Sequence, residues 1–309
     1  MKRFMKHLYD NRVWLVMVLP GTIWFLLLAY LPMAGNILAF KDFRYHPDGF
    51  IESIRTSEWV GWENFQFLFS TSDAWIITRN TVLYNAVFIV VGLILAVALA
   101  ILLSQLVNRK LAKIYQTGML FPHFLSWVVV SYFVFTFLSM DRGLANTILG
   151  FFNIPPISWY NEPAYWPFVL TFINFWKGVG FASIVYLAAI AGINRDYYEA
   201  AMIDGANKWQ QIKHVTLPAL MPLIVILTIL DIGKIFSADF GLFYQVPRDS
   251  GTLYSVTNVI DTYVYRGLMQ MGDISMTTAA GLYQAFVGFI LVLLTNYIAK
   301  KIDPDYALF

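Results

Sequence analysis

Long apolar runs alternate with polar segments along the 309 residues of this chain. A helix needs about twenty apolar residues to cross a bilayer, and six runs meet that requirement. Their bounds are 13–32, 81–103, 116–139, 165–190, 217–236 and 277–298. Pro122 and Pro222 fall inside two runs, which spanning helices tolerate when neighbours satisfy the freed backbone groups. The pattern predicts an all-α membrane protein with six transmembrane helices in one domain over residues 1–309.

The first run follows a basic stretch, Met1 to Arg12, as the apolar part of a signal peptide also does. The run is too long for a signal peptide, and no small-residue cleavage site follows it. We therefore interpret residues 13–32 as an uncleaved first span.

Basic residues gather in alternate connections, and this asymmetry predicts the orientation because cytoplasmic loops are enriched in Lys and Arg. One side holds Lys2, Arg3, Lys6, Arg12, Arg109, Lys110, Lys113, Arg195, Lys208, Lys213, Lys300 and Lys301. The other side holds fewer in longer loops: Lys41, Arg44, Arg55, Arg79, Arg142, Arg248 and Arg266. Both termini and the segment 194–216 are therefore predicted to be cytoplasmic, and the loops 41–80, 140–163 and 237–276 extracytoplasmic. Tryptophans in these outer loops indicate an interfacial aromatic belt or, alternatively, a platform for a delivery partner.

Composition indicates a membrane protein and argues against metal, thiol and nucleotide-binding sites in this chain. Charged residues make up 13% and apolar residues 59%, whereas a soluble domain has about a quarter charged residues. The chain has no cysteine, and its four histidines are scattered, so no metal-ligand spacing is present. No segment fits the P-loop pattern for nucleotide phosphates. We expect no catalytic residues, no metal and no cofactor bound by this chain, and no enzymatic activity of its own.

A polar interruption from Asn194 to Pro222 separates two of the apolar runs. Asn194 or Asp196 can cap a first short helix, and Glu199 follows Asp196 at capping-box spacing. Gly205 stands where a helix ends in a left-handed turn. Asn207 can then cap a second helix, with Trp209, Ile212 and Val215 along one side, before Leu217 and Pro218 begin the next apolar run. This pattern predicts two short helices that are joined at a glycine and held at a membrane surface. Such an arrangement is typical of a segment that docks onto another protein.

The same residues resemble the EAA loop of membrane subunits of binding-protein-dependent ABC importers. That motif has Glu-Ala-Ala, three residues, Gly, nine residues, Ile, one residue and Leu-Pro. This chain matches with Glu199, Ala200, Ala201, Gly205, Leu217 and Pro218 and departs only at Val215. The resemblance extends from Val13 to Lys301 and is greatest to carbohydrate permeases of the oligo- and polysaccharide branch. The segments 261–266 and 279–282 favour that branch.

The resemblance implies a type I importer permease in a bacterial cytoplasmic membrane. It implies a second, usually non-identical permease, two ATP-binding subunits that carry ATP and Mg, and an extracytoplasmic solute-binding protein that delivers an oligosaccharide. ATP-driven closure of the ATPases would then rotate the spans. The expected ATPase-coupling residues are Glu199, Ala200, Ala201, Asp204, Gly205, Trp209, Ile212, Leu217 and Pro218. Nucleic acid is not an expected partner.

Charged and polar side chains inside the spans are candidates for a substrate path. A charge at bilayer depth is costly and usually faces a protein interior or a wet cavity. The candidate set is Asn174, Trp176, Lys177, Asp231, Lys234, Tyr283 and Gln284. Asp231 and Lys234 lie three residues apart on one helix face, so an internal ion pair that fixes packing is the alternative. Lys177 could instead extend its ammonium to the membrane surface.

Two other classes of function remain open at this point. An ion-coupled secondary transporter would need a cation or proton site in broken helices, and Asp231 is the only acidic candidate within a span. A membrane scaffold for partner proteins would need no substrate path.

Overall fold

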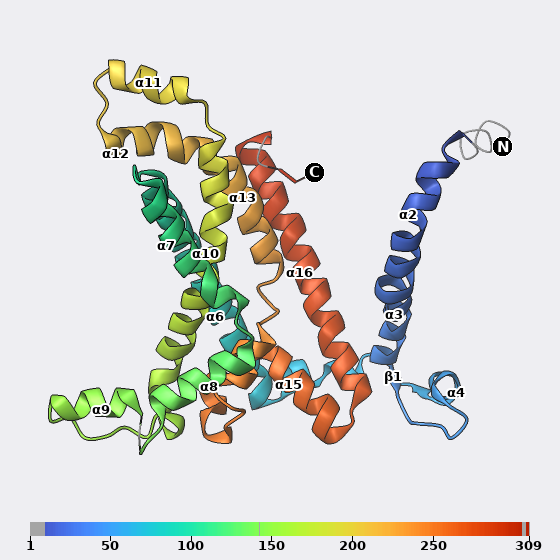
Figure 1. Cartoon of the computed structure of the whole chain (residues 1–309). Helices are drawn as coiled ribbons and strands as arrows, with labels where there is room; N and C mark the ends of the chain where they lie inside the picture. The colour runs from blue at the N-terminus through green and yellow to red at the C-terminus, as the bar shows by residue number, and fades with distance from the viewer. Residues whose placement is uncertain (1–9, 142, 305–306, 309) are drawn as a thin grey trace. The chain divides into compact units, whose positions relative to one another are not determined.

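The computed structural model describes residues 10–141, 143–304 and 307–308 (Figure 1). Lys2, Arg3, Lys6 and Arg142, which entered the prediction of orientation, lie outside these residues. Contacts divide the chain into two compact units. Unit 1 runs up to Ser70 and from Arg266 to Tyr283, and unit 2 comprises Thr71–Tyr265 and the chain from Gln284 onward.

The described chain is largely helical, which confirms the predicted all-α membrane fold. Five of its helices are long and apolar enough to cross a membrane: Arg12–Phe40, Asp73–Ser104, Pro163–Ala191, Lys208–Gly233 and Ile274–Ile302. A sixth candidate is the pair Lys110–Phe124 and Trp127–Leu138, whose axes are bent by 98°. These helices overlap all six predicted spans, and the fourth differs from its prediction by one residue at its end.

Unit 1 begins with one long helix made of four segments. They are α2 (Arg12–Phe25), the π-helix η1 (Leu26–Tyr30), α3 (Leu31–Met33) and the 3₁₀-helix η2 (Ala34–Phe40). The strands β1 (Lys41–Asp42) and β2 (Glu58–Trp59) then pair antiparallel around α4 (Phe50–Thr56). The rest of the unit holds η3 (Glu63–Phe65), α5 (Phe67–Ser70), η9 (Gly267–Met271) and the start of α16 (Ile274–Ile302). Its small core contains Ala39, Phe65 and Ala279.

Unit 2 is organised around two long helices, α6 (Ser72–Ser104) and α10 (Trp166–Ala191), which pack along each other. The Thr71 hydroxyl accepts a hydrogen bond from Ala74 N, so α6 begins well before the predicted start at residue 81. One core centres on Trp166 and Leu170, and the other on Ala100 and Tyr186. Shorter elements are α9 (Leu144–Phe151), η4 (Trp159–Asn161), η5 (Pro163–Tyr165), η7 (Gly241–Gln245), η8 (Gly251–Leu253), α14 (Tyr254–Thr257) and α15 (Ile260–Arg266).

The third predicted span, 116–139, is two helices rather than one. α7 (Arg109–Phe124) ends just after Pro122, and α8 (Trp127–Leu138) starts after Leu125 and Ser126, which are both extended. The Ser126 hydroxyl accepts a hydrogen bond from Val129 N at 3.3 Å and so caps the start of α8. An apolar run predicts the membrane environment of both helices, but it does not reveal a break between them.

The fifth predicted span, 217–236, is the second part of a longer helix that ends at Gly233. α12 (Lys208–Gln211), the π-helix η6 (Ile212–Thr216) and α13 (Leu217–Gly233) follow one another without interruption. Pro218 has no N–H, which removes the regular helical donor at this point. Leu217 N instead bonds to the carbonyl of Ile212, five residues earlier, so the π turn keeps the helix continuous.

Candidate functional site

Residues 194–216, which we call the coupling loop after their predicted role, lie at one end of α10 and α13 and fold as a helical hairpin (Figure 1). Its first helix, α11 (Arg195–Ile203), is capped by Asn194, whose side chain accepts a hydrogen bond from Asp196 N at 3.1 Å. Asp196 lies within the first helical turn, so the predicted capping box of Asp196 and Glu199 does not form. The box lies at the second helix, where Asn207 and Gln210 each accept a hydrogen bond from the other's backbone N–H.

Gly205 terminates α11 in the left-handed turn that the sequence predicted. Its φ is +78°, and a Cβ at this position would meet no atom within 4 Å. Gly205 N bonds to the carbonyl of Met202 at 3.1 Å, and Ala206 N bonds to that of Ala201 at 2.8 Å. This is the Schellman arrangement, which satisfies carbonyls at the helix end. Glycine is needed here for its backbone conformation rather than for space.

Two polar contacts hold the two helices of the coupling loop together. The Tyr198 hydroxyl lies 2.9 Å from the Thr216 hydroxyl and joins α11 to η6. The buried Gln211 side chain donates to the carbonyl of Ala206 at 3.0 Å and fixes the turn against α12. The hairpin is therefore braced from inside and does not depend on a partner for these bonds.

The outer surface of the coupling loop is apolar at its tip. Ile203 is 87% exposed and Trp209 is 70% exposed, and Tyr197 and Met202 are exposed as well. Glu199 is exposed and accepts no hydrogen bond from the described residues. Large apolar side chains on a rigid polar loop are typical of a protein contact surface. Two other predicted coupling residues differ in their exposure. Pro218 is exposed, whereas Leu217 packs against a buried cluster of unit 2.

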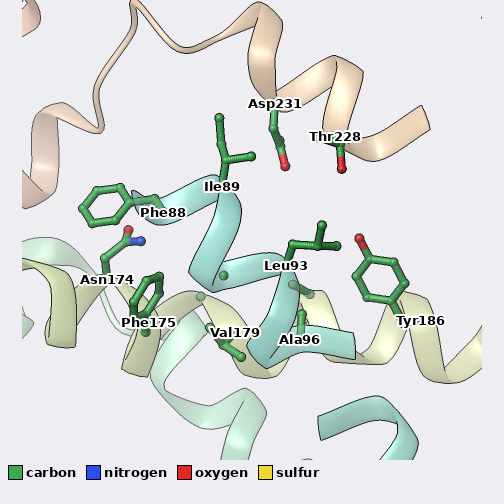
Figure 2. A pocket seen from close by; sticks show the side chains of 13 residues that line it. Phe88, Ile89, Leu93, Ala96, Asn174, Phe175, Val179, Tyr186, Thr228 and Asp231 are labelled. Carbon is green, nitrogen blue, oxygen red and sulfur yellow. The ribbon is translucent and has the colours of Figure 1, made fainter. Parts of the chain in front are cut away.

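A cavity of about 180 Å³ lies among α6, α10 and α13 of unit 2, with a mostly apolar lining. We call it the polar cavity because Asn174, Tyr186, Thr228 and Asp231 also line it. Asp231 and Thr228 point from α13 toward α6, and Tyr186 reaches the same space from α10 (Figure 2). No described residue donates a hydrogen bond to the Asp231 carboxylate, which leaves it available to a polar ligand or water.

The cavity brings together two predicted path residues, Asn174 and Asp231, and adds Tyr186 and Thr228. Tyr186 and Thr228 were missed because single hydroxyls in apolar helices are common and often bond within the helix. Although they lie three residues apart, the described side chains of Asp231 and Lys234 form no ion pair with each other. The internal ion pair considered from their spacing is therefore absent.

The other predicted path residues lie elsewhere. Trp176 lines an apolar groove with α7 and α8, and Tyr283 belongs to unit 1, where its ring contacts Phe69. Gln284 donates to the carbonyl of Phe236 at 2.6 Å and to the Asp261 carboxylate at 3.3 Å. Lys177 donates to the carbonyl of His123 at 2.7 Å. In the part of the chain that the structure describes, no three His, Asp or Glu side chains could hold a metal ion together.

Its long apolar helices give the chain the architecture of a multi-pass membrane protein. The sequence model for the inner membrane component of binding-protein-dependent transport systems matches residues 88–304. The chain belongs to this family.

Individual relatives extend the similarity over nearly the whole chain. The polygalacturonan/rhamnogalacturonan transport system permease protein YteP of Bacillus subtilis is 37% identical over 98% of this chain and 92% of its own length. Protein LplB of the same organism is 34% identical over 94% of this chain and 90% of its own. A crystal structure of a bacterial ABC transporter involved in import of the acidic polysaccharide alginate superposes with a TM-score of 0.87. That match has 32% identity and covers 97% of this chain and 99% of the other.

Proposed function

We propose that this chain is a membrane-spanning subunit of an ABC importer that translocates oligosaccharides or polysaccharide fragments across a bacterial cytoplasmic membrane. In this proposal an extracytoplasmic solute-binding protein delivers the saccharide, and a second permease completes the pathway. ATP and Mg bind to two separate ATP-binding subunits. Support comes from the family membership and from relatives whose names specify polysaccharide transport.

The coupling loop carries the mechanical part of the proposal. Its two helices are capped, joined by a Schellman turn and braced by the Tyr198–Thr216 contact. The second helix continues through η6 into α13, so a displacement at the loop moves a spanning helix directly. Exposed apolar side chains such as Ile203 and Trp209 would enter a cleft on the ATPase. ATPase closure would then rotate α13 as a rigid body.

The polar cavity supports the chemical part of the proposal. Sugars present many hydroxyl groups, which need hydrogen-bond partners when they leave water. Asn174, Tyr186, Thr228 and the Asp231 carboxylate supply such groups at the surface of otherwise apolar helices. We infer that this cavity forms part of the saccharide path, and that α13 connects it to the coupling loop.

The test is co-purification with a tagged copy of this chain from its native membrane, followed by reconstitution in proteoliposomes. The proposal requires an ATP-binding subunit in the complex and ATP-dependent uptake of an oligosaccharide, with oligogalacturonates and neutral oligosaccharides as the first probes. Uptake that is independent of ATP and depends on an ion gradient would instead identify a secondary transporter. A complex whose ATPase activity shows no response to substrate-loaded binding protein would favour a scaffold.

A further inference from the structure

The break between α7 and α8 exposes backbone groups that a continuous helix would satisfy. The last carbonyls of α7 have no helical donor, and they carry the negative end of the helix dipole. The Lys177 ammonium donates to one of them, the carbonyl of His123, at 2.7 Å. Lys177 thus places a positive charge at the C-terminus of α7, where such a charge is stabilising.

The neighbouring residues of α10 fix Lys177 in register with the end of α7. A Cβ at Gly180 would overlap the carbonyl oxygen of Met119, so the two helices approach as closely as glycine permits. The His123 ring stacks on Phe181 with centroids 4.3 Å apart and planes at 9°. The end of α7 is therefore held on α10 by a close backbone contact, a stacked ring and one charged hydrogen bond.

Trp127, the first residue of α8, continues this set of contacts. The Lys177 ammonium lies 5.1 Å from the centre of the Trp127 ring. The indole N–H donates to the Asp239 carboxylate at 3.0 Å, and the second oxygen of that carboxylate accepts a hydrogen bond from Leu242 N at 3.2 Å. A Cβ at Gly241 would overlap the Trp127 ring, so the turn at Gly241 also packs directly on the indole.

Asp239 links these contacts to the helix that leaves the coupling loop. It follows the end of α13 at Gly233 by a short connection, whose carbonyls at Ile235 and Ser237 accept hydrogen bonds from Asn85 at 2.8 and 3.0 Å. The connection is thus held to α6 on one side and to Trp127 on the other. A movement of α13 would reach the break in the third span through Asp239.

We propose that Lys177, Trp127 and Asp239 form a clamp that positions the break between α7 and α8 and joins it to α13. This inference rests on the proposed function only for its effect on transport. Its residues are positioning residues and not saccharide ligands. The Lys177 ammonium already contacts a carbonyl and an aromatic ring, so an acidic sugar would have to displace contacts that hold three helices.

The clamp is tested by a distance measurement that needs no transport. Because the chain has no cysteine, Lys113→Cys in α7 and Thr136→Cys in α8 allow two spin labels at exposed sites. In the purified complex we expect one narrow distance distribution. Lys177→Met should broaden or shift it, and Trp127→Phe, which keeps an aromatic ring but removes the N–H donor, should do the same. Lys234→Met is the matched control, because Lys234 forms no ion pair with a described residue, and it should leave the distribution unchanged.

Transport kinetics separate positioning from ligand binding. Lys177→Met should lower the maximal uptake rate about tenfold or more, the scale of a lost charged hydrogen bond, at unchanged KM for an oligogalacturonate and for a neutral oligosaccharide. The double variant with Asp239→Asn should be little worse than the more affected single variant. Unchanged spin-label distances in both Lys177→Met and Trp127→Phe overturn the clamp. A KM increase confined to the anionic saccharide also overturns it and identifies Lys177 as a ligand. If no ATPase accompanies the chain, the proposed function fails while the distance measurement still decides the clamp.

Discussion

Gly205 offers a test of the coupling loop that separates backbone conformation from packing. Its φ of +78° lies in the left-handed region, and no atom lies within 4 Å of the position that a Cβ would occupy. Gly205→Val therefore adds no clash but places a β-branched residue in a conformation that L-residues disfavour. The left-handed conformation costs a non-glycine residue about 1–2 kcal/mol. If the variant relieves that strain by opening the Schellman turn, the docking conformation becomes less populated by about 5- to 30-fold.

The expected result is a protein that inserts normally but binds its ATPase weakly. The assay is titration of the detergent-purified permease with the co-purifying ATP-binding subunit, together with substrate-stimulated ATPase activity of the reconstituted complex. Gly205→Asn should retain most of the affinity, since asparagine tolerates the left-handed region better than valine.

Gly272 provides the matched control for this experiment. It ends η9 with a φ of +70°, has open space around its Cβ direction and lies in unit 1, outside the coupling loop. Gly272→Val should impose similar backbone strain without weakening ATPase binding. Affinity of Gly205→Val within twofold of the unmodified protein would refute the argument, as would an equal loss of affinity in Gly272→Val.

Two further predictions concern buried or enclosed carboxylates. Asp231→Leu should slow saccharide uptake about tenfold, the scale of a lost hydrogen bond to a charged group, and should leave ATPase co-purification intact; full uptake in this variant would remove the cavity from the path. Burial raises the pKa of the Asp261 carboxyl despite its hydrogen bonds from Ala238 N and Gln284. The unfolded chain therefore releases this proton at lower pH than the folded protein does. The contribution of Asp261 to stability is greatest below the unfolded pKa and falls as pH rises through the folded pKa. Thermal unfolding across the acidic range should show this decline in the unmodified protein and a smaller one in Asp261→Asn, and the opposite sign of the difference would contradict the assignment.

Hydrophobic runs predicted where the long apolar helices lie, because their composition is local to each run. The fourth span, which carries no internal break, was predicted to within one residue at its C-terminal end. The third was not, because Leu125 and Ser126 are as compatible with a helix as their neighbours. In the structure, the residues on either side of these two contact α10 and the connection after α13.

Among the candidate site residues, too, some features were predicted from the sequence and others were not. Gly205 was predicted correctly because a left-handed helix end depends on one residue type at one place. Asn207 was predicted correctly as the cap of the second helix. The reciprocal hydrogen bond from Asn207 N to Gln210 was not predicted, because Asp196 and Glu199 have the same spacing as a capping box and drew the prediction to the first helix. Lys177 was predicted as a charge facing a cavity, but its partner is a backbone carbonyl of another helix. Every residue has a backbone carbonyl, so the sequence does not indicate which carbonyl will accept a hydrogen bond from Lys177, and only the fold shows it.

The proposed mechanism depends above all on contact between the tip of the coupling loop and an ATP-binding subunit on the cytoplasmic side. Single cysteines at Ile203 and Trp209 test this contact directly, because the chain has no other cysteine and both positions are exposed. We expect both to crosslink to the ATP-binding subunit through a short photoactivatable reagent and to be inaccessible to a membrane-impermeant maleimide in intact cells. Labelling of either cysteine from outside the cell, or the absence of any crosslink to an ATP-binding subunit in the active complex, would contradict the account.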